Sequence, residues 1–276
     1  LSLSDGRLAL AAFEAPIEAI ALDARVHDGA LDLTRGSATI GDGTVELIGS
    51  VQPLTAEPNI SWKLAVKNIA IERLLPARAP HEPRLRGRVS TTAEGRAVGL
   101  SWPRISQTLS GTGRLQVHQA SIENLNVVRA ALGRLSIIPG LVELLETRLP
   151  ESARAKLTAR DTAIQPIDVP LTIQDGRMWC QNVKLTTDTM ELEGGGFCGL
   201  DRTWEAPMRL RIAADLSAPM VKSVNQLGGL TNSQGQLEFP VAFRHQPPHV
   251  FPDLEYVATR LIQGQAQQFI GNLFER

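Results

Sequence analysis

Apolar and polar residues alternate along most of this chain, and short turns interrupt the alternation. Asp28-Gly29, Asp42-Gly43 and Asp175-Gly176 provide residues that accept the positive φ angles of hairpin turns. Segments such as 62–66 and 208–212 alternate with a period of two, which is typical of strands with one apolar face. We therefore predict a mainly β protein in which antiparallel meanders build an extended sheet.

Two segments repeat the same order of signals with different residues. Residues 28–49 and 175–196 each contain an Asp-Gly turn, a strand-like segment, a second turn, an alternating strand and a final glycine. Such internal repetition is typical of a sheet extended by similar units. A sheet with one apolar face needs something apolar to cover that face.

Two other segments depart from the alternation. Residues 124–150 have apolar residues at helical spacing, and we expect two short helices there, with Asn124 as the N-cap. Residues 252–276 have the pattern of an amphipathic helix. The proline-rich segment 76–86 predicts a module boundary. The expected modules are therefore an N-terminal meander at 1–80, a second β module at 84–246 that contains the helical insertion, and the C-terminal helix.

Composition narrows the classes of partner. The chain has 276 residues, of which 43% are hydrophobic, so one long β domain or two modules can form. Aromatic residues make up only 4%, and the charged residues that give a net charge of -1 are scattered. Neither stacking platforms nor a basic stripe is available for nucleic acid. The chain opens on Leu1, so we interpret it as part of a longer protein.

No enzymatic motif stands out. The chain has no Gly-x-Ser-x-Gly elbow, no His-Glu-x-x-His and no phosphate-binding loop. Its five histidines are scattered. We therefore expect a protein without catalytic residues, metal site or cofactor, although distant residues can in principle assemble an active site.

Cys180 and Cys198 lie nine residues on either side of Thr189, inside a predicted hairpin. One interpretation is a pair of buried thiols that act as small hydrophobic groups. The other is a cross-strand disulfide, which requires an oxidising compartment. The spacing leaves both open.

The order of signals from Leu109 to Arg244 resembles the C-terminal region of the AsmA-like proteins of double-membrane bacteria. The segments that carry the resemblance are 109–115, 120–127, 171–178, 183–187, 190–196, 208–212 and 237–241. The resemblance implies a long, twisted, partly open β-groove of the kind found in bridge-like lipid transfer proteins. It also implies a periplasmic location, with an inner-membrane anchor outside this chain. Phospholipid acyl chains on their way to the outer membrane would be the ligand.

The alternation places one set of apolar residues on one face of the sheet, and these are the predicted lining of the groove. They are Leu31, Leu33, Val45, Leu47, Leu64, Val66, Leu115, Val117, Leu171, Ile173, Met190, Leu192, Leu210 and Ile212. A closed core, in which helices cover the whole face, is the alternative. That alternative would suit a structural or assembly factor for outer-membrane biogenesis that acts through protein contacts.

The C-terminal helix carries Gln263, Gln265, Gln267 and Gln268 on its polar face, where a membrane-surface helix usually has Lys and Arg. We therefore expect it to dock on protein, with Phe269 and Leu273 as anchors. It would cap the groove or contact an outer-membrane or periplasmic protein.

Overall fold

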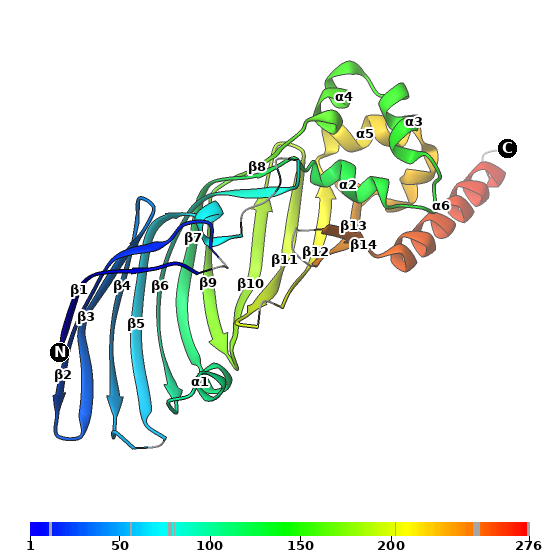
Figure 1. The fold of residues 1–276 in the computed structure, drawn as a ribbon. Helices are drawn as coiled ribbons and strands as arrows, with labels where there is room; N and C mark the ends of the chain where they lie inside the picture. The colour runs from blue at the N-terminus through cyan, green and yellow to red at the C-terminus, as the bar shows by residue number, and fades with distance from the viewer. Residues whose placement is uncertain are drawn as a thin grey trace. The chain divides into compact units, whose positions relative to one another are not determined.

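The computed structural model describes residues 1–10, 13–55, 57–76, 79, 81–201, 203–244 and 249–274, with side chains described as far as Gly264. The chain is mainly β, as predicted, and its strands form one open antiparallel sheet (Figure 1). Its strands are β1 (Ser2–Leu8), β2 (Ile17–His27), β3 (Ala30–Ile40), β4 (Gly43–Gln52), β5 (Asn59–Ala70), β6 (Arg84–Val98), β7 (Ser110–Glu123), β8 (Thr162–Ile164), β9 (Ile167–Gln174), β10 (Arg177–Thr186), β11 (Met190–Gly199), β12 (Trp204–Ile212), β13 (Glu238–Arg244) and β14 (His249–Pro252).

The strands follow one another across the sheet in nearly the order of the chain. The order runs from β1 to β7 and then from β9 to β14, while β8 pairs with β7 outside this path. Strands β1 and β14 are thus the two edges. Such a meander is what hairpin turns between half-apolar strands produce.

The predicted turns are present, with one shift in position. Asp28-Gly29 and Asp175-Gly176 both have positive φ angles, as hairpin turns of this kind require. The turn between β3 and β4 uses Gly41, whose φ is 60°, so Gly43 belongs to the strand. At Gly43 a Cβ atom would lie 2.7 Å from the Cα of Ile69, so only glycine lets β5 approach this closely.

The helical segments are η1 (Ile71–Leu74), α1 (Trp102–Thr108), α2 (Val127–Gly133), α3 (Leu141–Arg148), α4 (Glu151–Thr158), α5 (Ala214–Ser223), η2 (Asn225–Leu230) and α6 (Leu254–Phe274). The expected insertion at 124–150 is helical but continues through α4, because Pro150 precedes the first turn of α4 and does not end the region. The N-cap of α2 is Asn126 and not Asn124, since the Asn126 side chain accepts a hydrogen bond from Arg129 N at 2.9 Å.

The chain divides into two compact units. The first unit contains Leu1–Ser121, Gln165–Asn182 and Gly196–Trp204, and the second contains Ile122–Ile164, Val183–Gly195 and Glu205–Arg276. The predicted boundary between residues 80 and 84 does not separate these units. Strands β5 and β6, on either side of that loop, pair along most of their length from Asn59↔Val98 to Ala70↔Arg88.

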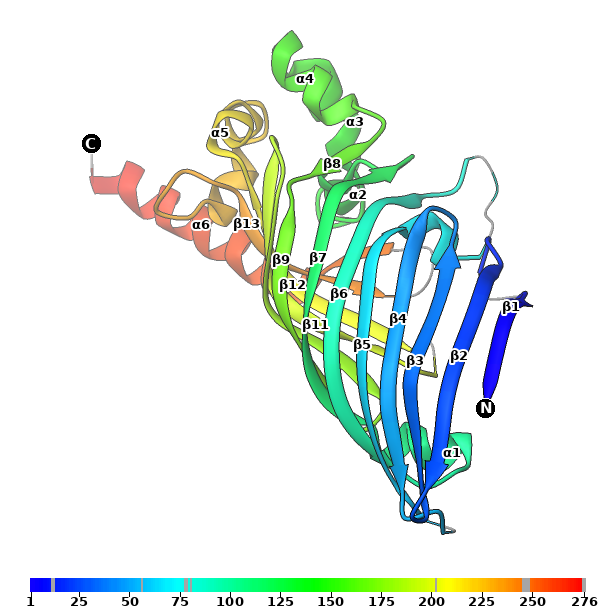
Figure 2. The ribbon, with the colours of Figure 1, turned by 90° about the vertical axis from the view of Figure 1, so that its left-hand side faces the viewer.

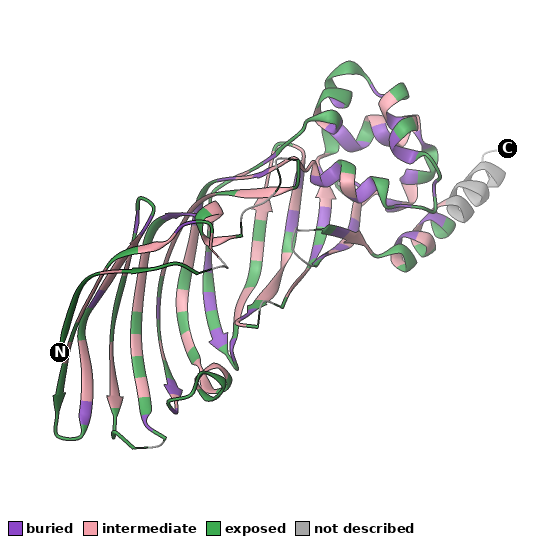
Figure 3. Cartoon of the chain, viewed as in Figure 1, coloured by how far each residue is buried: buried purple, intermediate pink, exposed green. Residues whose placement is uncertain are grey.

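The two units bury their side chains differently. In Figure 3 the strands of the first unit are largely intermediate or exposed, whereas the helices of the second unit carry many buried residues. Leu157 of α4 and Leu216 and Met220 of α5 are almost fully buried there, as are Leu210 and Phe239 from the strands. The second unit therefore has a closed core made by helices and strands together.

Candidate functional site: an apolar sheet face

One face of the sheet in the first unit is lined by apolar residues on strand after strand. Direct cross-strand partners lie on the same face of a sheet. The registers pair Leu47 with Leu64 and Leu64 with Ala93. Ala93, Leu171 and Ile173 then form one cluster with partly buried neighbours that include Trp62. We call the surface that contains Leu33, Leu47, Leu64, Ala93 and Leu171 the apolar face.

The predicted lining residues of the first unit all fall on this face. Val45 pairs with Val66 and Gly113 pairs with Leu171. Leu31 and Leu33 lie on the same face because they pair with Val51 and Gly49 of β4. Leu115 and Val117 of β7 and Ile173 of β9 lie on it because they alternate along their strands with Gly113 and Leu171, which pair with each other. Because several of these side chains are half-buried or exposed, the protein itself covers this face only in part.

Small residues on the apolar face bring neighbouring strands close together. A Cβ atom on Gly49 would meet the carbonyl of Ser61, and one on Gly111 would meet the carbonyl of Glu94. Gly95 is crowded in the same way by β7 and by the Trp62 ring. Crowding of Cβ positions against the next strand occurs on the inner side of a curved sheet, and Figure 2 shows the long strands β2 to β7 bending.

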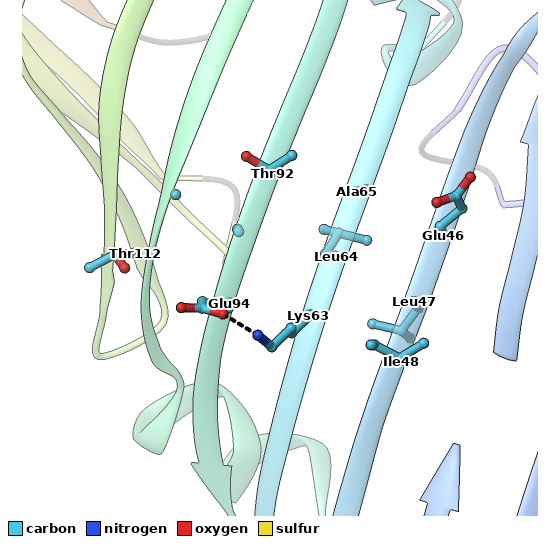
Figure 4. A pocket seen from close by; sticks show the side chains of 11 residues that line it. Glu46, Leu47, Ile48, Lys63, Leu64, Ala65, Thr92, Glu94 and Thr112 are labelled. Atoms are coloured by element: carbon cyan, nitrogen blue, oxygen red, sulfur yellow. Dashed lines mark ion pairs between the residues drawn. The ribbon is translucent and has the colours of Figure 1, made fainter. Parts of the chain in front are cut away.

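Two hollows lie along successive rows of cross-strand partners. The first has a volume of about 530 Å³. Its lining includes Leu47, Leu64, Ala93 and Gly113 but also Glu46, Lys63 and Glu94, and Figure 4 shows the Lys63–Glu94 ion pair there. The second has a volume of about 810 Å³, and its lining includes Leu33, Gly49, Trp62, Gly95 and Gly111 together with Asp32, Lys63, Glu94 and Arg96. Trp62, Gly95 and Gly111 were not among the predicted lining residues. They lie two residues along their strands from Leu64, Ala93 and Gly113, so the alternation of the sequence places them on the same face and could have identified them.

Trp62 is the one large aromatic side chain of the second hollow. A Cβ atom on Gly95 would lie 2.7 Å from Cζ2 of Trp62, so the indole covers this glycine. Its Nε1 is buried and has no hydrogen-bond partner among the described residues. A buried N–H group without a partner is unfavourable, so this atom is a donor that a bound molecule can satisfy.

One end of the apolar face is covered by the chain itself. Ala15, Ile40 and Ile69 form a buried cluster with partly buried neighbours that include Phe13 and Leu74. Backbone hydrogen bonds from Glu14 N to Leu75 O and from Ala15 N to Arg73 O hold the two covering segments together, at 3.0 and 3.3 Å. The hydrophobic face is therefore closed at this end and open farther along the strands.

The opposite face of the same strands is charged and exposed. Lys63 pairs with Glu94 at 2.8 Å, and Lys67 pairs with Glu46 at 3.2 Å. The hydrogen bond from Lys63 lowers the pKa of Glu94, and the hydrogen bond from Arg114 lowers that of Asp168. Cross-strand pairs of this kind keep that face in water, which leaves the apolar face as the surface that can bind apolar molecules.

The remaining four predicted lining residues lie in the second unit, and for them the lining assignment is wrong. Met190 and Leu192 are 3% and 2% exposed, and Leu210 and Ile212 are fully buried. They are part of the closed core of the second unit and, as the structure stands, expose almost no surface to a ligand.

The two cysteines are free thiols in the first unit. Leu200 N donates to Gly176 O, and the rings of Trp179 and Phe197 are 4.8 Å apart. Both contacts fit a pairing of Trp179 with Phe197, which makes Cys180 and Cys198 diagonal neighbours. Diagonal positions are about 7–8 Å apart, beyond the usual reach of a disulfide. The disulfide therefore stays a prediction that requires backbone movement. Burial raises the pKa of the Cys180 thiol, and the neighbouring Cys198 raises it further.

The first half of α6 packs on protein. Val257 and Leu261 are buried, and Gly229 of η2 lies so close that a Cβ atom there would be 3.1 Å from the Cα of Leu261. Ile262, in contrast, is exposed. The proposed anchors Phe269 and Leu273, and the glutamines after Gly264, lie outside the residues whose side chains are described.

Within the described residues, no helix combines the length and the apolar character that crossing a membrane requires. In the same part of the chain, no group of three or more His, Cys, Asp or Glu side chains is placed to hold a metal ion. In comparisons with known proteins, no family model, no curated protein and no solved structure matches this chain.

Proposed function

We propose that this chain is the periplasmic part of an AsmA-like protein and that its first unit shelters phospholipid acyl chains during transport between the inner and outer membranes. The observation that carries the proposal is the apolar face, which runs across successive strands and is only partly covered. Its leucines, including Leu47 with 36% of its surface exposed, remain available to a ligand.

Acyl chains suit this face better than a polar ligand does. Burial of apolar surface gains about 25 cal/mol per Å² whatever apolar group covers it, so a flexible hydrocarbon chain can replace the missing protein cover. Trp62, on the apolar face, has a buried Nε1 with no hydrogen-bond partner among the described residues.

Lipid extraction followed by mass spectrometry of the purified protein tests the proposal, and two positions of β4 supply the variant and its control. Leu47 lies on the apolar face, and Thr44 lies on the charged face, where it pairs with Lys67; both are exposed. Leu47→Asp places a charge among acyl chains and is expected to remove co-purifying phospholipid. Thr44→Asp should leave it unchanged. Equal lipid content in wild type and folded Leu47→Asp protein would contradict the proposal.

A second candidate is a structural factor that acts through protein contacts, and the closed core of the second unit favours it. A unit whose apolar face is already filled by its own helices has no room for lipid. If the purified protein carries no lipid but binds a periplasmic or outer-membrane protein through the second unit, this candidate replaces the first.

A further inference from the structure

Three sulfur-containing side chains come together in the first unit, on strands β10 and β11. Met178 pairs with Ile173 of β9, and Cys180 pairs with Leu171, so both side chains lie on the apolar face. They also pack against the buried cluster that contains Leu171 and Ile173. The third side chain, that of Cys198, comes from the neighbouring strand β11.

Cys198 reaches the same face through the register of β10 and β11. The pairing of Trp179 with Phe197, described above, sets this register. Met178 then lies directly opposite Cys198, and Cys180 lies diagonally across from it. Cβ atoms of directly opposite residues are about 4.5–5.5 Å apart, and those of diagonal residues are within about 7–8 Å. The thioether and the two thiols are therefore neighbours on one face.

The separation that disfavours a disulfide suits a metal bridge. A disulfide holds its two sulfur atoms about 2.05 Å apart. Two thiolates that bind one metal ion, each at about 2.3 Å, can be as far as about 4.6 Å apart when the ion lies between them. A diagonal pair of cysteines can therefore bind one ion without the backbone movement that a disulfide requires.

The donor atoms select a soft ion. Thiolate and thioether sulfur favour Cu(I), whereas hard cations favour oxygen. A structural zinc ion needs four ligands from Cys, His or carboxylate side chains, and the described part of the chain places no group of three or more of these together. Asp201, whose charge acts on Cys198, already accepts hydrogen bonds from Thr203 at 2.6 and 3.0 Å. Cu(I), which is stable with two or three sulfur ligands, fits the site.

The two thiols differ in their access to solvent. Cys198 is exposed and Cys180 is half-buried, so an ion can enter past Cys198 and reach Cys180. Burial raises the pKa of both thiols. They are therefore protonated at neutral pH in the free protein, and metal binding must release their protons.

We propose that Met178, Cys180 and Cys198 form a binding site for one Cu(I) ion. Two S–H bonds break and two Cu–S bonds form, the two protons pass to water, and the copper stays Cu(I) throughout. The thioether donates a lone pair as the third ligand. The site departs from our expectation of a protein without metal, because only strand pairing brings the thioether to the thiols. It goes beyond lipid transport and does not depend on it.

Titration of the reduced protein with Cu(I) under nitrogen, in competition with the coloured chelator bicinchoninate, tests the site. We expect one Cu(I) per chain. X-ray absorption by the loaded protein should show only sulfur ligands around the copper. Two ions per chain, or nitrogen and oxygen ligands, would overturn the proposal.

Variants then assign the ligands. Cys180→Ser and Cys198→Ser should each weaken Cu(I) binding by more than about 100-fold, since even losing a hydrogen-bond partner of a ligand costs about 10- to 100-fold. Met178→Leu should weaken it by about tenfold, because a neutral thioether is the weaker donor. The matched control is Met208→Leu, the same change on β12 in the second unit, which should leave the affinity unchanged.

Circular dichroism shows whether each variant is folded, and Cys180→Ala, which suits the apolar surroundings of this thiol, replaces Cys180→Ser if that variant does not fold. An unchanged affinity in a folded variant of either cysteine would overturn the proposal, because one thiolate would then hold the ion alone. Equal effects of Met178→Leu and Met208→Leu would contradict the role of the thioether.

Discussion

The same local pattern of apolar and acidic residues occurs in both units, as Val45-Glu46-Leu47 in the first and Met190-Glu191-Leu192 in the second, but its leucine is exposed in one unit and buried in the other. Leu47 is 36% exposed and Leu192 is 2% exposed. Each leucine is on the apolar side of its strand, and each glutamate pairs with a basic residue on a neighbouring strand, Lys67 for Glu46 and Arg211 for Glu191. The difference lies in what covers the apolar side, which is distant in sequence from both segments.

The second unit covers its strands with large side chains from helices. Leu216 and Met220 of α5 and Leu227 of η2 are almost fully buried with the strand residues. The first unit instead places glycines at Gly49, Gly95 and Gly111, which bring strands together and leave hollows beside them. An apolar strand face can therefore make either a core or a binding surface, and the residues opposite it decide which.

The largest expected effect comes from placing one charge in both environments. Leu192→Asp buries an unpaired carboxylate in a closed core and should lower the free energy of unfolding by more than about 4 kcal/mol. Leu47→Asp should lower it by less than about 1 kcal/mol, since water reaches that position. Denaturant unfolding monitored by circular dichroism measures both. Similar losses of stability would mean that the first unit also has a closed core.

A smaller effect is expected from removing one hydroxyl group. Ser217 is fully buried; its Oγ donates to Ile212 O and accepts from Leu237 N, both at 2.9 Å. Ser217→Ala leaves two backbone groups unsatisfied and should cost about 2 kcal/mol of unfolding free energy. The control is Ser61→Ala, which removes an exposed hydrogen bond to Ser50 in the first unit and should change stability by less than about 0.5 kcal/mol. Equal effects would contradict the different burial of the two units.

The alternation of the sequence is sufficient to predict the strands and the face on which Leu47 and Leu64 lie, because side chains alternate strictly along a strand. It cannot show that Leu192 is buried, since burial depends on residues distant in the sequence and no local pattern records that packing. The glycines were missed for a related reason. Gly95 and Gly111 contribute no apolar side chain to the pattern, although their lack of a side chain shapes the hollow.

Helix boundaries show the same limit. Pro150 predicts the end of a helix, but proline is also favoured where a helix begins, and α4 follows it directly. Asn124 and Asn126 are equally good capping residues by type. Only the positive φ of Asn124 and the hydrogen bond that Asn126 accepts from Arg129 N separate their roles.

The smallest expected effect is a difference in acid sensitivity between the polar faces of the two units. In the second unit, burial would raise the pKa of Glu238, but hydrogen bonds from Arg211 and Arg209 outweigh it and hold the pKa below its usual value of 4.5. In the first unit, a hydrogen bond from Arg114 lowers the pKa of the exposed Asp168. A carboxyl group with a lowered folded pKa adds stability above its unfolded pKa, and that stability is lost as the pH falls through the folded pKa.

Glu238→Gln should therefore reduce the free energy of unfolding at pH 7 and flatten the fall in that free energy below about pH 4.5. Asp168→Asn should do the same more weakly and lose its effect in 1 M salt, because water and ions screen an exposed pair. Thermal unfolding from pH 2.5 to pH 7 at two salt concentrations measures both, and an equal salt dependence would show that the two polar faces are solvated alike.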